Sequence, residues 1–161
     1  MLFVCLGNIC RSPTAHAVFR SMVESRGLSG QILVDSAGTG DWHLGHAPDR
    51  RTSAQAAERG YDMSDLRARL VEPKDFEQFD YIIGMDHENI SNLMLIRPAD
   101  YTGHVELFLS FSQNPENRDQ RVVPDPYYGG ENGFALVLDL VEDAAAGLLN
   151  HIVAELERGS Q

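Results

Sequence analysis

Apolar residues along the chain form two kinds of pattern that alternate with each other. Short apolar runs, typical of buried strands, lie at residues 2–6, 32–38, 80–85 and 104–109. Apolar residues with the spacing of a helix lie between or after these runs, at residues 12–26, 49–59, 88–97 and 134–156. Strands that alternate with helices are typical of parallel sheets with crossover helices. We therefore predict an α/β fold, a three-layer sandwich in which helices flank a four-stranded parallel sheet.

Residues that begin or end helices support these boundaries. Ser12 is a good N-cap for the first helix, and Pro13 a good first helical residue. Gly27 and Gly60 are typical helix stops. Residues 112–133 are rich in Asn, Asp, Pro and Gly, so we expect a loop there. A loop of this length is often functional.

Length and charge limit the possible functions. The chain has 161 residues, which suits a single domain spanning 1–161 with one hydrophobic core. The formal net charge is −11, and residues 72–161 hold 17 acidic and 5 basic side chains, against 7 and 8 in residues 1–71. A basic groove for nucleic acid is therefore not expected. An anion is bound more easily in the near-neutral first part, by backbone amides and one or two arginines.

The cysteine content indicates a reducing compartment. Two cysteines are too few for the disulfide framework of a small secreted protein. MLFVCL is too short for a signal-peptide core, and no apolar run reaches the length of a membrane helix. We expect a soluble, cytoplasmic protein with no membrane partner. His43 and His46 are spaced for a shared metal, but they lack a cysteine or carboxylate partner in a recognised pattern, so no metal or cofactor is expected.

Candidate chemistry concentrates in the stretch VCLGNICRSPTA, residues 4–15. Cys5 is expected at the carboxyl end of the first strand, where open parallel sheets bind ligands. A helix N-terminus follows, whose free amides and dipole attract an anion and favour a thiolate. Arg11 adds a permanently charged planar group that can hold two phosphate oxygens. A thiolate in such a site is a nucleophile aimed at phosphorus. The connecting loop residues, expected to bind phosphate, are Leu6, Gly7, Asn8, Ile9 and Cys10.

Three polar or small residues of this stretch acquire a function in that interpretation. Gly7 lets the backbone bend inward, and Asn8 tolerates a left-handed conformation. Ser12 can cap the helix and also donate its hydroxyl to the sulfur of Cys5, which would stabilise the thiolate. The alternative is that Cys5 is a small core residue and Arg11 a surface arginine, which requires their neighbours to occur there by coincidence.

The same stretch resembles a known family. CLGNICRSP is similar to the Cys-x5-Arg-Ser signature of the low-molecular-weight protein tyrosine phosphatases. Further similar segments occur in family order along nearly the whole chain: DSAGTGDW at 35–42, RAR at 67–69, FDYIIGMD at 79–86 and DPYYGG at 125–130. The resemblance implies hydrolysis of phosphotyrosine in proteins through a cysteinyl-phosphate, with Cys5 as nucleophile and Arg11 binding phosphate.

Asp125 is the general acid that the resemblance implies. A carboxylic acid on a loop over the site can protonate the departing phenolate, and can later activate the water that hydrolyses the cysteinyl-phosphate. From the sequence alone, a turn-forming role is equally compatible, because Asp-Pro is a common turn pair.

Aromatic residues in predicted loops are candidates for the pocket walls. By resemblance, Trp42, Tyr127 and Tyr128 line a deep slot for an aryl ring, although half-buried packing is an alternative. Related protein-arginine phosphatases carry threonine at the position of Ile9, so Ile9 favours phosphotyrosine.

Some further residues have implied supporting roles. In the family, a cysteine at the position of Cys10 forms a reversible disulfide with the nucleophile, here Cys5, and prevents over-oxidation; a small apolar loop residue is the alternative. Ser36 matches a serine that hydrogen-bonds the loop asparagine, and Asp86 matches an acid near the pocket, although both could be solvated strand-end residues. Leu66 stands where many members have a histidine that steadies that asparagine.

Other functions are compatible with parts of the pattern. A thioredoxin-coupled arsenate reductase shares the Cys-x5-Arg loop but needs further redox cysteines, and none follows Cys10. A domain that carries phosphate on a cysteine has no need of a general acid, which the DPYY segment supplies. The intact set of Cys5, Arg11, Ser12 and Asp125 argues against an inactive phosphotyrosine-binding module.

Overall fold

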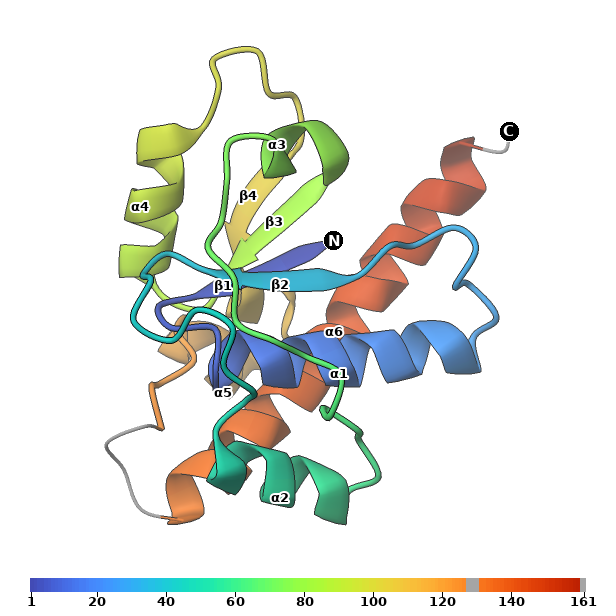
Figure 1. The fold of residues 1–161 in the computed structure, drawn as a ribbon. Coiled ribbons are helices and arrows are strands. Elements are labelled where there is room, and N and C mark those ends of the chain that lie inside the picture. The colour runs from blue at the N-terminus through green and yellow to red at the C-terminus, as the bar shows by residue number, and fades with distance from the viewer. Residues whose placement is uncertain (127–130, 160–161) are drawn as a thin grey trace.

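A four-stranded parallel sheet forms the centre of the molecule (Figure 1). The computed structural model describes residues 1–126 and 131–159. All neighbouring strands run parallel, in the order β2-β1-β3-β4. Their bounds are Leu2–Cys5 for β1, Asp35–Gly38 for β2, Tyr81–Gly84 for β3 and His104–Leu107 for β4. The predicted four-stranded parallel sheet is confirmed.

Helices cover both faces of this sheet. In Figure 1, α1 and α6 lie on one side, with α2 beyond them, and α3 and α4 lie on the other. The predicted three-layer sandwich is therefore confirmed. The helices are α1 (Arg11–Ser25), α2 (Arg50–Glu58), α3 (Asp75–Gln78), α4 (His87–Ile96), α5 (Pro115–Gln120) and α6 (Glu131–Gly159), with a 3-10 turn η1 at Phe108–Phe111.

Strand β1 explains why the sheet can be covered on both faces. Successive side chains of a strand point to opposite faces. Phe3 and Cys5 belong to the core cluster shared with α1 and α6, whereas Leu2 and Val4 belong to a second cluster on the other face. All four are 3% exposed or less, which accounts for the unbroken apolar run in the sequence.

Local sequence patterns predicted the long elements better than the short ones. Residues 32–34 lie outside β2, which begins at Asp35. The expected continuous loop at 112–133 is wrong, because α5 lies within it and α6 begins at Glu131. Helices α3 and α5 have only four and six residues, too few for a helical apolar period to be visible.

The start of α1 also differs from the prediction. The N-cap position is Cys10, whose side chain makes no capping hydrogen bond, so Ser12 lies inside the helix and is not its cap. Gly27 and Gly60 end their helices as predicted, with left-handed φ values of 68° and 89°. The hydroxyl of Ser12 is directed instead toward the loop between β1 and α1, as described below.

Helix α6 is the longest helix of the molecule, but it is an amphipathic helix that packs on α1. In residues 1–126 and 131–159, no helix combines the length and the apolar character that crossing a membrane requires.

Candidate active site

The loop between β1 and α1 lies where the strand order changes direction. Strand β1 is flanked by β2 on one side and by β3 on the other, and such switch points form crevices at the carboxyl ends of parallel strands. Cys5 is the last residue of β1. Its Sγ accepts the backbone N–H of Asn8 at 3.3 Å and lies 3.0 Å from Oγ of Ser12. The Asn8 N–H is thus a donor at the sulfur, and the Ser12 hydroxyl lies within hydrogen-bond distance of it.

Asn8 organises this loop through its side chain. Its φ of 58° is left-handed, a conformation that Asn tolerates better than most residues. Nδ2 of Asn8 donates to Ser12 Oγ at 2.8 Å, and Oδ1 accepts the backbone N–H of Arg69 at 3.0 Å. With Asn8 2% exposed and Ser12 fully buried, these bonds brace the loop from behind.

The bracing partners are not the ones that the resemblance implied. Ser36 Oγ is hydrogen-bonded to Nδ1 of His16 on α1 at 2.9 Å, and not to Asn8. Leu66, at the position of the common family histidine, is buried in an apolar cluster with Ala17, Ala56 and Met63. The backbone N–H of Arg69 steadies Asn8 instead. This contact could not be predicted from the sequence, because every residue except proline has a backbone N–H and the residue type does not show which one is used.

Arg11 is oriented by a carboxylate and a carbonyl. Nη1 donates to Oδ2 of Asp86 at 2.6 Å and to the carbonyl oxygen of Val123 at 3.1 Å, while the side chain is only 4% exposed. Burial acts to lower the pKa of Arg11, but Cys5 and the hydrogen-bonded Asp86 outweigh it and raise that pKa above its usual value. Asp86 also caps α4 by accepting the N–H of Asn89, so the arginine is tied to a helix end.

Asp125 reaches the site because the segment before it is anchored. The N–H of Val123 donates to the carbonyl oxygen of Met85, just after β3, at 2.8 Å. Val123 itself is fully buried. Two residues later, Oδ2 of Asp125 lies 3.8 Å from Nη2 of Arg11, with 38% of its side chain exposed. The carboxylate therefore lies beside the guanidinium of Arg11 and faces solvent.

These residues surround one cavity of about 330 Å³, at the lower end of the range for small-molecule sites. Trp42 is 68% exposed and lies over Gly40, where a Cβ atom would overlap the indole ring. The lining residues are Cys5, Leu6, Gly7, Ile9, Cys10, Arg11, Trp42, His43 and Asp125. Asn8, Ser12 and Asp86 support these residues from behind, and Tyr127 and Tyr128 lie outside the described residues.

His43 is the lining residue that sequence reasoning missed. Its spacing from His46 suggests only a metal ligand, whereas its position next to Trp42 in the same loop is the signal that indicates the pocket. A Cβ added to Gly7 would lie 3.0 Å from Cδ2 of His43, so the ring packs closely on the loop. Among the residues that the structure describes, no three His, Cys, Asp or Glu side chains are grouped to hold a metal ion.

Cys10 differs from Cys5 in its surroundings. Both thiols are free and buried. Burial raises the pKa of the Cys10 thiol to about 12, so that this side chain remains protonated near neutral pH. The cavity therefore contains one thiol with hydrogen-bond donors at its sulfur and a second one that burial keeps neutral.

The sequence matches the family described as low molecular weight phosphotyrosine protein phosphatase over residues 1–159. The chain belongs to this family of enzymes. The Bacillus subtilis low-molecular-weight protein-tyrosine-phosphatase YfkJ is 41% identical over 96% of this chain and 96% of its own. The crystal structure of YfkJ, which covers 96% of this chain and 94% of the solved one, superposes with a TM-score of 0.87.

Two further solved structures show how far the phosphatase fold extends. A protein tyrosine phosphatase from Entamoeba histolytica, with Hepes in its active site, has a TM-score of 0.88 at 40% identity and covers 99% of this chain and 97% of its own. A Drosophila arginine phosphatase has a TM-score of 0.85 at 30% identity, over 94% and 96% of the two chains. Solved proteins named as a tyrosine phosphatase and as an arginine phosphatase therefore both resemble the fold of this chain.

Proposed function

We propose that this phosphatase hydrolyses phosphotyrosine in proteins through a cysteinyl-phosphate intermediate. The observation that carries the proposal is the position of Cys5 Sγ, which contacts the N–H of Asn8 and Oγ of Ser12 and lines the same cavity as Arg11 and Asp125. A thiolate with a cation and an acid around one cavity has the parts that phosphate-ester cleavage requires.

In the first step, Cys5 Sγ attacks phosphorus and an S–P bond forms while the bond from phosphorus to the phenolic oxygen breaks. Asp125 transfers its proton to that oxygen, so the leaving group departs as a neutral phenol. Charge on the transferred phosphoryl oxygens is stabilised by the guanidinium of Arg11 and by the amides of the loop from Leu6 to Cys10.

In the second step, water replaces the sulfur. The Asp125 carboxylate accepts a proton from the attacking water, an O–P bond forms, and the S–P bond breaks. The Cys5 thiolate is restored. The hydroxyl of Ser12, whose Oγ lies 3.0 Å from the sulfur, can stabilise the departing thiolate by donating a hydrogen bond to it. Inorganic phosphate is then released and Asp125 is again protonated, ready for another cycle.

The walls of the cavity support an aryl substrate. Ile9 and Trp42 are apolar lining residues of the cavity. The resemblance described above, in which arginine phosphatases have threonine at the position of Ile9, also favours phosphotyrosine. An aryl ring gains burial against such surfaces, whereas the short side chain of phosphoserine would not reach past the rim. Tyr127 and Tyr128 stay predicted wall residues.

Three proteins assayed together test this proposal: wild type, Cys5→Ser and Asp125→Ala, with p-nitrophenyl phosphate and a phosphotyrosine peptide. We expect turnover by wild type at mildly acidic pH, none above background for Cys5→Ser, and a loss of about 10²-fold or more for Asp125→Ala with phosphate binding retained. Wild-type protein without turnover would overturn the enzyme, and an undiminished Asp125→Ala would remove this residue from the mechanism.

Parallel substrates decide between related activities. Phosphoarginine and phosphoserine peptides should be hydrolysed much more slowly than phosphotyrosine peptides, and faster release of phosphate from phosphoarginine would overturn the substrate class. A cytoplasmic location, a single domain and the lack of a nucleic-acid partner stay predictions from the sequence. The Cys5→Ser variant, used to trap phosphoproteins, would identify the protein partners.

A further inference from the structure

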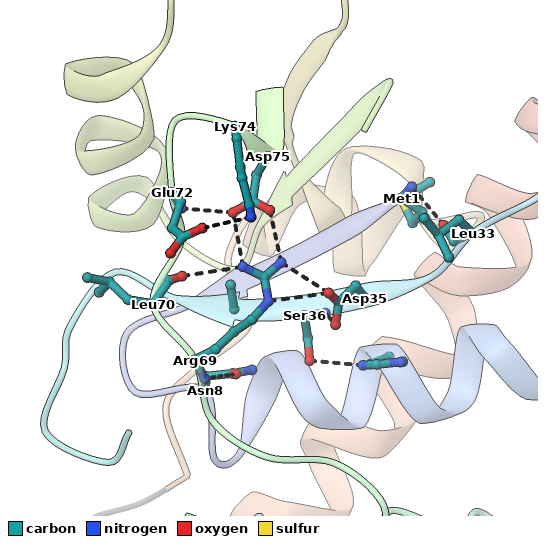
Figure 2. A network of polar contacts seen from close by, with 12 residues as sticks. Met1, Asn8, Leu33, Asp35, Ser36, Arg69, Leu70, Glu72, Lys74 and Asp75 are labelled. Atoms are coloured by element: carbon teal, nitrogen blue, oxygen red, sulfur yellow. Dashed lines mark hydrogen bonds and ion pairs between the residues drawn. The ribbon is translucent and has the colours of Figure 1, made fainter. Parts of the chain in front are cut away.

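Arg69 lies outside the catalytic cavity but connects it to two acidic residues. Its backbone N–H donates to Oδ1 of Asn8 at 3.0 Å. Its guanidinium joins carboxylates from two elements, as Figure 2 shows: Asp35 at the start of β2 and Asp75 at the start of α3. Nη2 lies 3.1 Å from Oδ2 of Asp35 and 3.0 Å from Oδ1 of Asp75. One residue therefore contacts the phosphate loop with its backbone and the two acids with its side chain.

The acid on α3 is itself held in place. The Asp75 side chain is 2% exposed, and its Oδ2 accepts both Nη1 of Arg69, at 3.1 Å, and the N–H of Glu72, at 2.8 Å. A planar guanidinium that forks onto a carboxylate is restricted in direction as well as in distance. The position of the Arg69 side chain is therefore determined by a buried partner.

The backbone of Arg69 is also attached to the sheet. The N–H of Gly38, at the end of β2, donates to the carbonyl oxygen of Arg69 at 2.8 Å, and the N–H of Val71 donates back to Gly38 at the same distance. Side chain and backbone together hold the N–H of Arg69 toward Asn8. This donor is provided by the main chain, so its direction depends on how residue 69 is held.

Asn8 connects the backbone amide of Arg69 to the nucleophile, Cys5. Its left-handed φ of 58° has to be maintained by its surroundings, and its side chain has partners at both ends, Arg69 and Ser12. Its own N–H donates to Sγ of Cys5, and Oγ of Ser12 lies 3.0 Å from the same sulfur. If the Arg69 amide moves, Asn8 loses one support, and both its N–H at the sulfur and its hydrogen bond to Ser12 lose their orientation.

We propose that Arg69 is a positioning residue for the phosphatase reaction, whose ion pairs with Asp35 and Asp75 hold the backbone amide that orients Asn8 around the Cys5 thiolate. The inference rests on the proposed function of Cys5. It adds an ion-pair clamp with one buried acid, Asp75, to the active site, acting through main-chain geometry and without contact to the substrate.

The test is Arg69→Gln, which keeps a polar side chain of similar length but removes the charge and the fork. Arg20→Gln is the matched control: Arg20 also pairs with both oxygens of one acid, Asp65, at 2.8 and 3.0 Å, and is 29% exposed against 32% for Arg69. Two quantities are measured against pH: hydrolysis of p-nitrophenyl phosphate, and alkylation of Cys5 by iodoacetate followed by mass spectrometry.

We expect Arg69→Gln to lower kcat about tenfold, less than the loss of a direct donor, with a smaller change in KM. Alkylation of Cys5 at a fixed pH should also be slower, since the sulfur loses an oriented N–H donor that favours the reactive thiolate. Arg20→Gln should show neither change. An Arg69→Gln protein that matches Arg20→Gln in both measurements would overturn the proposal.

A double-mutant cycle with Asn8→Ala identifies the route. If Arg69 acts through Asn8, Arg69→Gln changes kcat less than about twofold in the Asn8→Ala background. If Arg69→Gln lowers kcat by the same factor in the Asn8→Ala background as in wild type, the proposal is wrong. Should Arg69→Gln lose its fold by circular dichroism, Asp35→Asn is measured in its place. Slower alkylation of Cys5 is then expected, and an unchanged alkylation rate would contradict the proposal. Alkylation needs no turnover, so failure of the hydrolytic function itself would appear separately.

Discussion

The guanidinium of Arg11 and the carboxylate of Asp86 lie 2.6 Å apart, although 75 positions separate them in the sequence. Arg11 comes from the start of α1, and Asp86 caps α4 just after β3. Because β1 and β3 are neighbours in the sheet, the residues that follow them meet at the same edge. The phosphate-binding cation is thus oriented by an acid whose own position is determined by a helix end.

Substitution of Asp86 can separate its two roles. Asp86→Asn keeps a good N-cap for α4 but removes the charge beside Arg11, so we expect inorganic phosphate to inhibit about tenfold less well with little loss of stability. Asp86→Ala removes the cap as well and should lower the free energy of unfolding by about a further 1 kcal/mol. Inhibition constants and urea unfolding check both values. Phosphate inhibition unchanged in Asp86→Asn would mean that Asp86 serves α4 alone.

The two cysteines should differ in their reactions with iodoacetate and with peroxide. Because the pKa of Cys10 is raised to about 12, iodoacetate near pH 7 should label Cys5 and leave Cys10 unmodified. The predicted disulfide shield gives a second outcome: dithiothreitol should restore activity after peroxide treatment of wild type, but not of Cys10→Ser. Peptide mapping and recovered activity measure these effects. Equal recovery in both proteins would contradict the shield.

Buried His16 predicts a dependence of stability on pH. Burial, and then the nearby Arg20, lower its pKa from 6.5 to about 4 in the folded protein. The unfolded chain therefore binds the additional proton between these values, so stability falls as the pH is lowered through about 6.5 and levels off below about 4. The contribution to the change from about pH 7 to about pH 5 is about 2 kcal/mol.

This contribution can be isolated with His16→Gln, which removes the titrating group. Urea unfolding of both proteins at the two pH values should give a smaller pH-dependent loss for the variant than for wild type, by roughly that amount. Identical losses would show that His16 is not the residue responsible.

Gly38 is predicted to be irreplaceable because of the loop that it contacts. A Cβ atom at Gly38 would lie 2.7 Å from the carbonyl oxygen of Leu6 and 3.2 Å from Cβ of Asn8, so the phosphate loop would have to shift. Gly38→Ala should lower stability by about 1–3 kcal/mol and reduce kcat/KM. Gly30→Ala is the control, because its Cβ would meet no atom within 4 Å. Equal behaviour of the two variants, by calorimetry and kinetics, would contradict this account.

Much of the fold could be predicted from local patterns. The apolar runs at β1 and β3 and the helical spacing in α6 are properties of neighbouring residues, and they remained valid in the tertiary structure. Short elements were the exception, since α3 and α5 contain too few residues to show a period. By residue type, Ser12 is a good N-cap. In the structure its hydroxyl contacts Cys5 instead, and the helix begins one residue earlier, at Arg11.

The sequence by itself determined the chemistry of the site, because one continuous stretch carries the thiol, the loop amides and the arginine. Tertiary structure alone decided which groups orient them. Asp86 and the N–H of Arg69 lie 75 and 61 positions from the residues that they hold, Arg11 and Asn8. A carboxylate at a strand end and a main-chain donor both occur throughout the chain, and only parallel packing of the strands brings these particular ones to the phosphate loop.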